Sequence, residues 1–448
     1  MPDNRVSVVN VSDSFDKGEI ALATRKAIDR VGGMSSIVHN GDLVLIKPNL
    51  VVPRTSYSGI TTDLTILEEI VSEVITEKGK PIIGESSSIG YDQDLTFFIL
   101  GVRRLASKIG ARVVNFDKAP LTECKVPGGV IVKRVKLPQI VGEADAIINI
   151  PKMKTHELTT TTLSLKNVLG YLPRNKKQWA HIFNLNQALA DLNKVIRSDL
   201  IVVDGLLSME GNGPALGTAI NTGIIIAGRN PVHVDEVACK AMGVNPNEVL
   251  HLQLAKQQLP HAGGEAEVLG NLKPRKFSLP SRSRIFRLVE RIIFTMNYLL
   301  YSKLTLGGDV LPIRARLMRD VPAILGAKCT KCAECVQVCP TNGIDVKTMQ
   351  IDLSKCIGCM VCAEVCRDKA IITTRMSRMK GVREFFGPRL RSPPKLIVEN
   401  CVKCGECITM CPAGAISISK GTVKLDTRKC IRCVDKFCEM ACRQSAIE

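Results

Sequence analysis

The first 270 residues alternate short apolar runs with longer amphipathic stretches. Seven of the apolar runs have the length and the β-branched content of strands, and they cover residues 6–11, 43–47, 81–84, 111–116, 145–150, 200–205 and 223–228. Apolar residues at helical spacing lie between several of these runs, over residues 66–79, 95–110 and 185–196. Strands that alternate with helices are typical of a mostly parallel sheet covered by helices. The pattern therefore predicts an α/β domain.

Polar side chains gather after the predicted strands, where an open α/β sheet leaves its binding crevice. The segment NIPKMKTHELTTTTLSLKNVLG (residues 149–170) directly follows one strand and groups several cationic side chains in one predicted loop, which favours a carboxylate or phosphate ligand. The candidate catalytic residues are Lys152, Lys154, His156, Lys166 and Asn167, with Asp204 and Glu210 on the opposing lip. The alternative is a solvated loop with a structural histidine and an aspartate that only shapes a turn. The stretch GNGPALG lacks both the dinucleotide fingerprint and a P-loop lysine, so no nucleotide cofactor is predicted.

Sixteen of the 18 cysteines lie in four blocks near the C-terminal end, beginning at Cys329, Cys356, Cys401 and Cys430. Three blocks have the spacing C-x2-C-x2-C-x3-C, and the fourth reads C-x2-C-x4-C-x3-C. This is the run that binds [4Fe–4S] clusters, so sixteen thiolates predict four clusters per chain. A disulfide framework is typical of small secreted chains instead. Structural zinc usually takes two C-x2-C pairs separated by a longer loop.

The blocks form a nested repeat, because two neighbouring blocks make one unit and the unit recurs 72 residues later. Each unit resembles a two-cluster bacterial ferredoxin, over about residues 326–375 and 397–448. In that family the last cysteine of each run ligates the other cluster. The resemblance implies four ligand sets: Cys329, Cys332, Cys335 and Cys366; Cys356, Cys359, Cys362 and Cys339; Cys401, Cys404, Cys407 and Cys442; and Cys430, Cys433, Cys438 and Cys411. Alternating apolar residues on both sides of Lys420-Gly421 predict a hairpin within the second unit.

The N-terminal region resembles a family of large domains of unknown function that is often fused to ferredoxin modules. The resemblance spans about residues 40–245 and rests on IKPNLV, NIPKMKTH, TLSLKNVLG, DGLLSMEGNGP and AGRNPVHVDEVA. It implies an iron–sulfur cluster-binding protein and names no reaction.

Charge and cysteine content limit the classes of binding partner and the cellular compartment that we expect. The formal net charge is +18, and four oxidised clusters with their thiolates bring it to about +10. Aromatic content is only 4% and no nucleic-acid motif is present, which favours an acidic redox partner protein, an anionic substrate or a lipid surface over nucleic acid. No apolar run reaches the roughly 18 residues of a membrane span, and the first residues lack the apolar core of a secretory leader, so no such leader is expected. A cytoplasmic protein of an anaerobic cell is expected.

The predicted domain order is an α/β domain (1–270), a basic linker (271–322), a ferredoxin module (323–376), a second basic linker (377–396) and a second module (397–448). Residues 285–300 of the first linker show an apolar helical stripe, which either docks on the protein or contacts a membrane surface. We expect an electron-transfer oxidoreductase whose modules pass electrons to or from an α/β domain acting on a small anionic substrate. Two alternatives are an electron-carrying adaptor whose large domain binds a partner protein, and a non-redox enzyme with clusters as sensors.

Overall fold

A computed structural model describes two compact units, residues 1–88 with 96–308 and residues 89–95 with 309–448, apart from gaps within each. The described residues are 4–12, 16–88, 92–174, 176–177, 180, 184–215, 217–260, 263–280, 320–337, 339, 341–345, 347–352, 355–356, 358–368, 370–375, 395–403, 407–408, 415–419, 422–427, 442 and 446–447. The predicted helix of residues 285–300 lies outside them.

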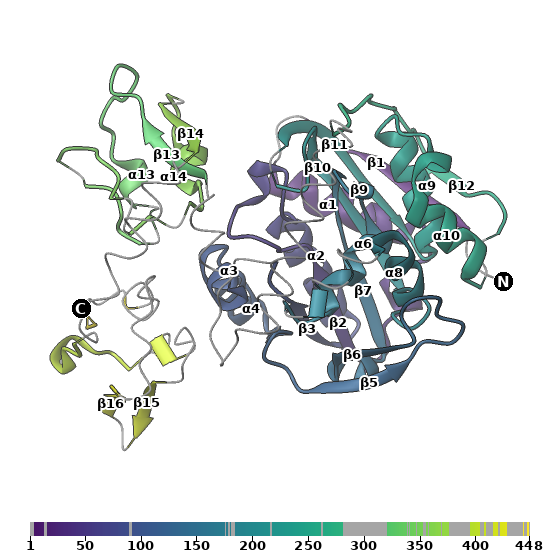
Figure 1. The fold of residues 1–448 in the computed structure, drawn as a ribbon, viewed down its shortest axis with the longest axis horizontal. Coiled ribbons are helices and arrows are strands. Elements are labelled where there is room, and N and C mark those ends of the chain that lie inside the picture. Colours follow the sequence, from purple (N-terminus) through teal and green to yellow (C-terminus); the bar gives the residue numbers. More distant parts are fainter. Residues whose placement is uncertain are drawn as a thin grey trace. The chain divides into compact units, whose positions relative to one another are not determined.

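The first unit is built on one mixed sheet with the strand order β12-β1-β11-β10-β7-β2-β3-β4 (Figure 1). Its strands are β1 (Arg5–Asn10), β2 (Leu43–Pro48), β3 (Lys80–Glu85), β4 (Arg112–Asn115), β7 (Ala146–Ile150), β10 (Leu200–Glu210), β11 (Thr218–Gly228) and β12 (Glu267–Gly270). The run from β10 through β7, β2 and β3 to β4 is parallel, as is the β1–β12 pair. Only β11 is antiparallel to its neighbours β1 and β10 along this order. The predicted mostly parallel α/β sheet is confirmed.

Helices cover both faces of the sheet, because alternate strand residues point to opposite sides. The helices are α1 (Lys17–Asp29), α2 (Leu64–Thr76), α3 (Gln93–Ile99), α4 (Val102–Ile109), α5 (Ile140–Glu143), α6 (Ser164–Asn167), α8 (Leu185–Leu192), α9 (Pro231–Ala241) and α10 (Leu250–Gln258). On one face, Val44 and Ile46 of β2 share a core with α1 and α2. On the other face, Leu45 packs in a core with α8.

Three local predictions from the sequence were wrong. The helix predicted over residues 95–110 is broken at Gly101, whose φ of 74° lies in the left-handed region, so α3 and α4 are separate. The strand predicted to end at residue 205 continues to Glu210 through a register shift against β11. The predicted loop after β7 is an antiparallel hairpin of β8 (Lys152–His156) and β9 (Thr160–Thr162), and β8 pairs with β10. A further hairpin, β5 (Leu121–Lys125) with β6 (Arg134–Pro138), had no prediction.

The second unit contains short strands and short helices. Strand β13 (Asp320–Ile324) is antiparallel to β14 (Ile371–Arg375), and the helices α13 (Glu334–Gln337) and α14 (Val361–Val365) lie between them in sequence. Strands β15 (Ile416–Ser419) and β16 (Thr422–Leu425) are antiparallel, which confirms the predicted hairpin.

Candidate functional site

A buried ion pair joins the carboxyl ends of two adjacent parallel strands. Lys47 lies near the end of β2 and Glu85 ends β3, and Nζ of the lysine is 2.8 Å from Oε2 of the glutamate with both side chains fully buried. The carboxylate also accepts hydrogen bonds from the backbone amides of Leu50 and Ser86. Gly170 makes room for the pair, because a Cβ there would lie 2.4 Å from Lys47 Nζ and Glu85 Oε1. Burial lowers the pKa of Lys47, and the charge of Glu85 opposes that shift.

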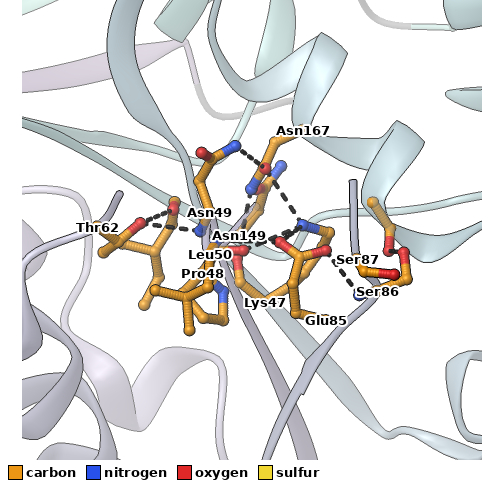
Figure 2. Close-up of polar contacts among 12 residues, drawn as sticks. Lys47, Pro48, Asn49, Leu50, Thr62, Glu85, Ser86, Ser87, Asn149 and Asn167 are labelled. Carbon is orange, nitrogen blue, oxygen red and sulfur yellow. Dashed lines mark hydrogen bonds and ion pairs between the residues drawn. The ribbon is translucent and has the colours of Figure 1, made fainter. Parts of the chain in front are cut away.

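Asn167 is the hub of the polar network around this ion pair (Figure 2). Its Oδ1 accepts from Lys47 Nζ at 3.2 Å and from Asn49 Nδ2 at 2.9 Å. Its Nδ2 donates to Asn149 Oδ1 at 2.7 Å. The amide of this predicted site residue therefore ties α6 to the ends of β2 and β7.

The two lysines of β8 are buried and bonded, and the loop predicted to carry them is corrected to a strand. Lys152 Nζ is 2.7 Å from Asp204 Oδ2, and both side chains are fully buried. Lys154 Nζ donates to Asn49 Oδ1 at 2.9 Å and to the carbonyl of Ile60 at 2.8 Å. Asp204 is thus the counter-ion of Lys152 rather than part of an opposing lip. Burial raises the pKa of Asp204, and the charge of Lys152 opposes that shift.

His156 and Glu210 make contacts with nearby backbone. His156 is buried at the end of β8, where its Nδ1 accepts from the backbone amide of Leu158 at 3.1 Å. Glu210 is half-buried at the end of β10, and its carboxylate accepts from the amide of Ser278 at 2.7 Å. Each side chain is thus held in place by a backbone amide, and the catalytic role predicted for both stays a prediction.

Lys166 differs from the other lysines because the described residues offer its amine neither a hydrogen bond nor an ion pair. It lies in α6 beside the Asn167 hub and keeps partial solvent exposure. Burial of the amine, then the charges of Lys177 and Lys47, lower the pKa of Lys166 to about 7. The pKa of Lys154 is also lowered well below its usual range, by burial and then by the charge of Lys166. The amines therefore form a cluster in which each protonated amine disfavours protonation of its neighbours.

Lys177 belongs to this cluster and had no sequence signal. It is buried, and its amine donates to the carbonyls of Ser86 and Ser87 at 3.2 and 2.9 Å. Burial lowers the pKa of Lys177 to about 8. In the sequence it stands in the run PRNKKQ, which is typical of a solvated loop.

In the second unit, Cys339, Cys356, Cys359 and Cys362 line one cavity together with Ile344 and Met360. Burial raises the pKa of the Cys362 thiol, and the charges of Cys359, Cys356 and Cys339 raise it further. The last cysteine of the first block is thus brought to three cysteines of the second block. Four converging sulfur atoms are the donor set that a [4Fe–4S] cluster requires.

The first three cysteines of block one also lie close together. Burial raises the pKa of Cys335, and the charges of Cys332 and Cys329 contribute. Cys366, the last cysteine of block two, packs in the same apolar cluster as Cys335 and Cys329. The same apolar cluster also contains Cys339 and Cys362. The ferredoxin resemblance implies that Cys366 joins the first three cysteines of block one at a second cluster.

Blocks three and four repeat the backbone bonds of blocks one and two. In each unit the residue four positions before the first cysteine donates its backbone amide to an alanine carbonyl. Leu325 donates to Ala370 at 2.7 Å in the first unit, and Ile397 donates to Ala446 at 2.8 Å in the second. Those two alanines lie four residues after the last cysteine of their unit, and their amides donate to Cys366 Sγ and Cys442 Sγ at 3.2 and 3.1 Å.

The hairpin that follows the first block of each unit is equivalent as well. The Asp352 amide donates to the carbonyl of Gly343 at 2.8 Å, and the Asp426 amide donates to that of Ala415 at 2.7 Å. In the second unit Cys407 is buried in an apolar cluster that Cys401 and Cys442 contact. The other predicted ligands of this module, Cys404, Cys411, Cys430, Cys433 and Cys438, lie outside the described residues.

Comparison with known families agrees with this architecture. Residues 44–240 match the family described as Domain of unknown function (DUF362). Residues 322–367 and 355–415 match two families described as 4Fe-4S dicluster domains. The C-terminal part is thus an iron–sulfur protein of ferredoxin type. The chain as a whole has a DUF362 domain followed by two 4Fe–4S dicluster ferredoxin domains, which confirms the resemblance seen in the sequence. The fourth cysteine block lies beyond both dicluster matches.

Individual relatives cover parts of the chain. A thylakoid-associated protein of Synechocystis is 27% identical over 248 residues, which is 52% of this chain and 74% of that protein. A ferredoxin-like protein in the nif region of Azotobacter vinelandii is 37% identical over 46 residues, 10% of this chain and half of that protein. The lactate racemase apoprotein of Thermoanaerobacterium thermosaccharolyticum aligns at 13% identity with a TM-score of 0.32, over 57% of this chain and 58% of that one. Among the described residues, no helix is long and apolar enough to cross a membrane.

Proposed function

We propose that this iron–sulfur protein is an oxidoreductase whose four [4Fe–4S] clusters pass electrons to or from a small anion bound beside Lys166. The observation that carries the proposal is that Lys166, a partly buried lysine of α6, has no bonding partner among the described residues and lies among other amines. The clusters, when bound, supply single electrons. The DUF362 domain supplies the binding site.

The charges around Lys166 favour an anion. Lys47 and Lys152 each have a carboxylate partner, whereas Lys154 is bonded by the neutral oxygens of Asn49 and Ile60. The amine of Lys166 therefore adds a charge that no neighbouring carboxylate balances. An anion bound there restores the protonated amine, because opposite charge favours the charged form. Lys166 as a residue keeps partial solvent exposure, so a small carboxylate or phosphate would reach the buried amine along its partly exposed side chain.

The rest of the network holds Lys166 in position. Asp235 of α9 accepts from Ser164 N at 2.9 Å, Ser164 Oγ at 2.6 Å and Leu165 N at 3.0 Å, at the start of α6. Asn167 anchors the end of the same helix to β2 and β7. With both ends of this short helix bonded, the amine is presented from a rigid element, as a site needs.

The repeated backbone bonds of the two ferredoxin units support four clusters rather than two. The described part of module two repeats backbone bonds of module one at Leu325/Ile397, Ala370/Ala446 and Gly343/Ala415, which supports the same cluster content in both modules. A redox partner protein completes the electron path. The density of reduced thiols is in keeping with a reducing compartment such as the cytoplasm.

The proposal is tested with Lys166→Met, which keeps the aliphatic stem and removes the charge. Lys80→Met is the matched control, because this exposed lysine is the first residue of β3, at the other end of the strand from Glu85. Both variants are purified without oxygen, reduced with dithionite, and mixed with a panel of small carboxylates, phosphates and oxoanions while cluster absorbance is followed.

We expect reoxidation by at least one anion in the wild type and in Lys80→Met. In Lys166→Met the apparent affinity should fall about ten- to a hundredfold, as for the loss of one bond to a charged group. Iron content should stay the same in all three proteins. Equal responses in Lys166→Met and the wild type would remove Lys166 from the site. Indifference of the reduced wild type to every anion would favour the adaptor, whose large domain binds a protein.

A further inference from the structure

The sulfur of Cys339 receives two nearby donors within its own loop. The backbone amide of Gly343 donates to Sγ at 3.2 Å, and the hydroxyl of Thr341 lies 3.5 Å from the same sulfur. A thiol and a hydroxyl can each donate to the other. Once the cysteine is an iron ligand its sulfur has no proton, so only Thr341 can donate.

Cys366, the last cysteine of the second block, has a hydrogen-bond acceptor at the position where Cys339 has the hydroxyl of Thr341. Two residues after Cys366 stands Asp368, whose carboxylate accepts a hydrogen bond from Thr330 Oγ1 at 2.6 Å. An ionised carboxylate has no proton to donate. Among the described residues, the hydrogen bond that Cys366 Sγ accepts comes from the Ala370 amide, which matches the Gly343 bond to Cys339. The two sites of this module therefore share the amide donor and differ in the hydroxyl.

The second block adds one more donor to the same set. The Gly358 amide donates to Cys356 Sγ at 3.4 Å, with Gly358 in the left-handed region at a φ of 71°. Hydrogen bonds to the sulfur ligands stabilise the more negative, reduced cluster and so raise its potential. A nearby carboxylate has the opposite effect, because it repels the added electron.

We propose that Thr341 holds the cluster of Cys339, Cys356, Cys359 and Cys362 at a higher reduction potential than the cluster of Cys329, Cys332, Cys335 and Cys366. An electron that enters this module then resides on the cluster with the higher potential, which is the one that Cys339 helps to hold. The proposal rests on the four-cluster function proposed above and on the exchanged ligation that the ferredoxin resemblance implies, and it adds the direction of electron flow inside the module.

The test compares Thr341→Val, which keeps the shape and removes the hydroxyl, with Thr341→Ser, which restores a hydroxyl. Thr348→Val is the matched control, because the Thr348 hydroxyl donates to the Asp345 carboxylate at 2.9 Å in an exposed turn and lies outside the sulfur-lined cavity. Potentials are measured on the full chain with all clusters loaded, by redox titration followed with electron paramagnetic resonance.

We expect Thr341→Val to shift one potential downward, Thr341→Ser to bring it back, and Thr348→Val to change none. Placing a hydroxyl at the other site with Asp368→Thr should raise a different potential, and by more than Asp368→Val, which removes the charge without adding a donor. Unchanged potentials in Thr341→Val at full iron content would overturn the proposal. So would a downward shift in the same cluster that Asp368→Thr raises. A wild type that holds only about half of the expected iron would contradict the four-cluster proposal and leave this comparison to be made within the loaded module.

Discussion

Lys152 of β8 and Asp204 of β10 face each other in parallel register, and their side chains form an ion pair with an Nζ–Oδ2 distance of 2.7 Å. Both side chains have no solvent exposure. The backbone amide of Asp63, which caps α2, donates to the same carboxylate oxygen at 2.7 Å. Two residues first considered for catalysis therefore join two strands and a helix cap in the interior.

We expect Lys152→Ala to lower the free energy of unfolding by about 3–5 kcal/mol, because it leaves the Asp204 carboxylate buried without its counter-ion. The measurement is denaturation of oxygen-free protein followed by far-ultraviolet circular dichroism. Lys256→Ala is the control, since its pair with Glu236 is partly exposed and a change below about 1 kcal/mol is expected. Equal effects of the two variants would show that burial adds nothing to the Lys152–Asp204 pair.

We expect anion binding to weaken as the pH rises above about 7, because Lys166 has a pKa of about 7 and must be protonated to hold the anion. The bound anion raises the pKa of the amine, so affinity falls up to tenfold per pH unit until that raised pKa is passed. Lys166→Arg should flatten the profile, since a guanidinium stays protonated throughout. The measurement is the apparent affinity between pH 6 and pH 9, and a sloping profile in the arginine variant would assign the titration to another group.

The same lysine links stability to pH in a defined direction. Its pKa is lowered on folding, so between about pH 7 and its ordinary value of 10.5 the unfolded chain binds more protons than the folded one. Without ligand, stability should therefore rise with pH across this window, as far as this residue contributes. Lys166→Met should reduce the slope, whereas Lys80→Met should not. Unfolding midpoints at pH 7 and pH 9 make the comparison.

We expect Gly170→Ala to disturb the Lys47–Glu85 pair, because the added Cβ would lie 2.4 Å from Lys47 Nζ and Glu85 Oε1. Overpacking of this kind costs about 1–3 kcal/mol, and it should also weaken anion binding at the neighbouring α6. Gly142→Ala is the control, since a Cβ at this helical position meets nothing within 4 Å and should leave stability unchanged or slightly higher. Equal stability of the two variants would mean that the pair can move aside without loss.

We expect reconstituted protein to contain close to sixteen iron and sixteen sulfide per chain, four for each of the four ligand sets. Cys339→Ser should perturb the cluster of Cys356, Cys359 and Cys362, with which Cys339 shares a cavity. Cys124→Ser, a change at a half-buried thiol of the first unit, should leave all clusters intact. Iron and sulfide analysis with spectroscopy checks both. About eight iron, stoichiometric zinc, or loss of the Cys329 cluster in Cys339→Ser would contradict the assignment.

The sequence alone was sufficient for features that depend on near neighbours. The apolar runs at 43–47, 81–84 and 145–150 became β2, β3 and β7, because a strand buried on both faces needs a continuous apolar stretch whatever its partners. The cysteine spacing was equally informative, since a cubane imposes its own size on the loop that wraps it. The 72-residue repeat predicted two equivalent units, and the matching bonds of Leu325 and Ile397 follow that repeat.

Only the tertiary structure decided which polar side chains are bonded inside the protein. Lys152 and Lys154 looked like ligands on a loop, yet their partners Asp204 and Asn49 lie 52 and 105 residues away. Local sequence does not predict a bond between residues so far apart in the chain, because the free energy of burying an amine depends on the partner it meets after folding. For the same reason the sequence did not predict that Lys177, in an apparently solvated run, is buried and bonded. Nor did it predict that the amine of Lys166 has no bonding partner among the described residues. Residue types and spacing determined the chemistry available to this chain, and long-range packing determined which of those groups remain open to a ligand.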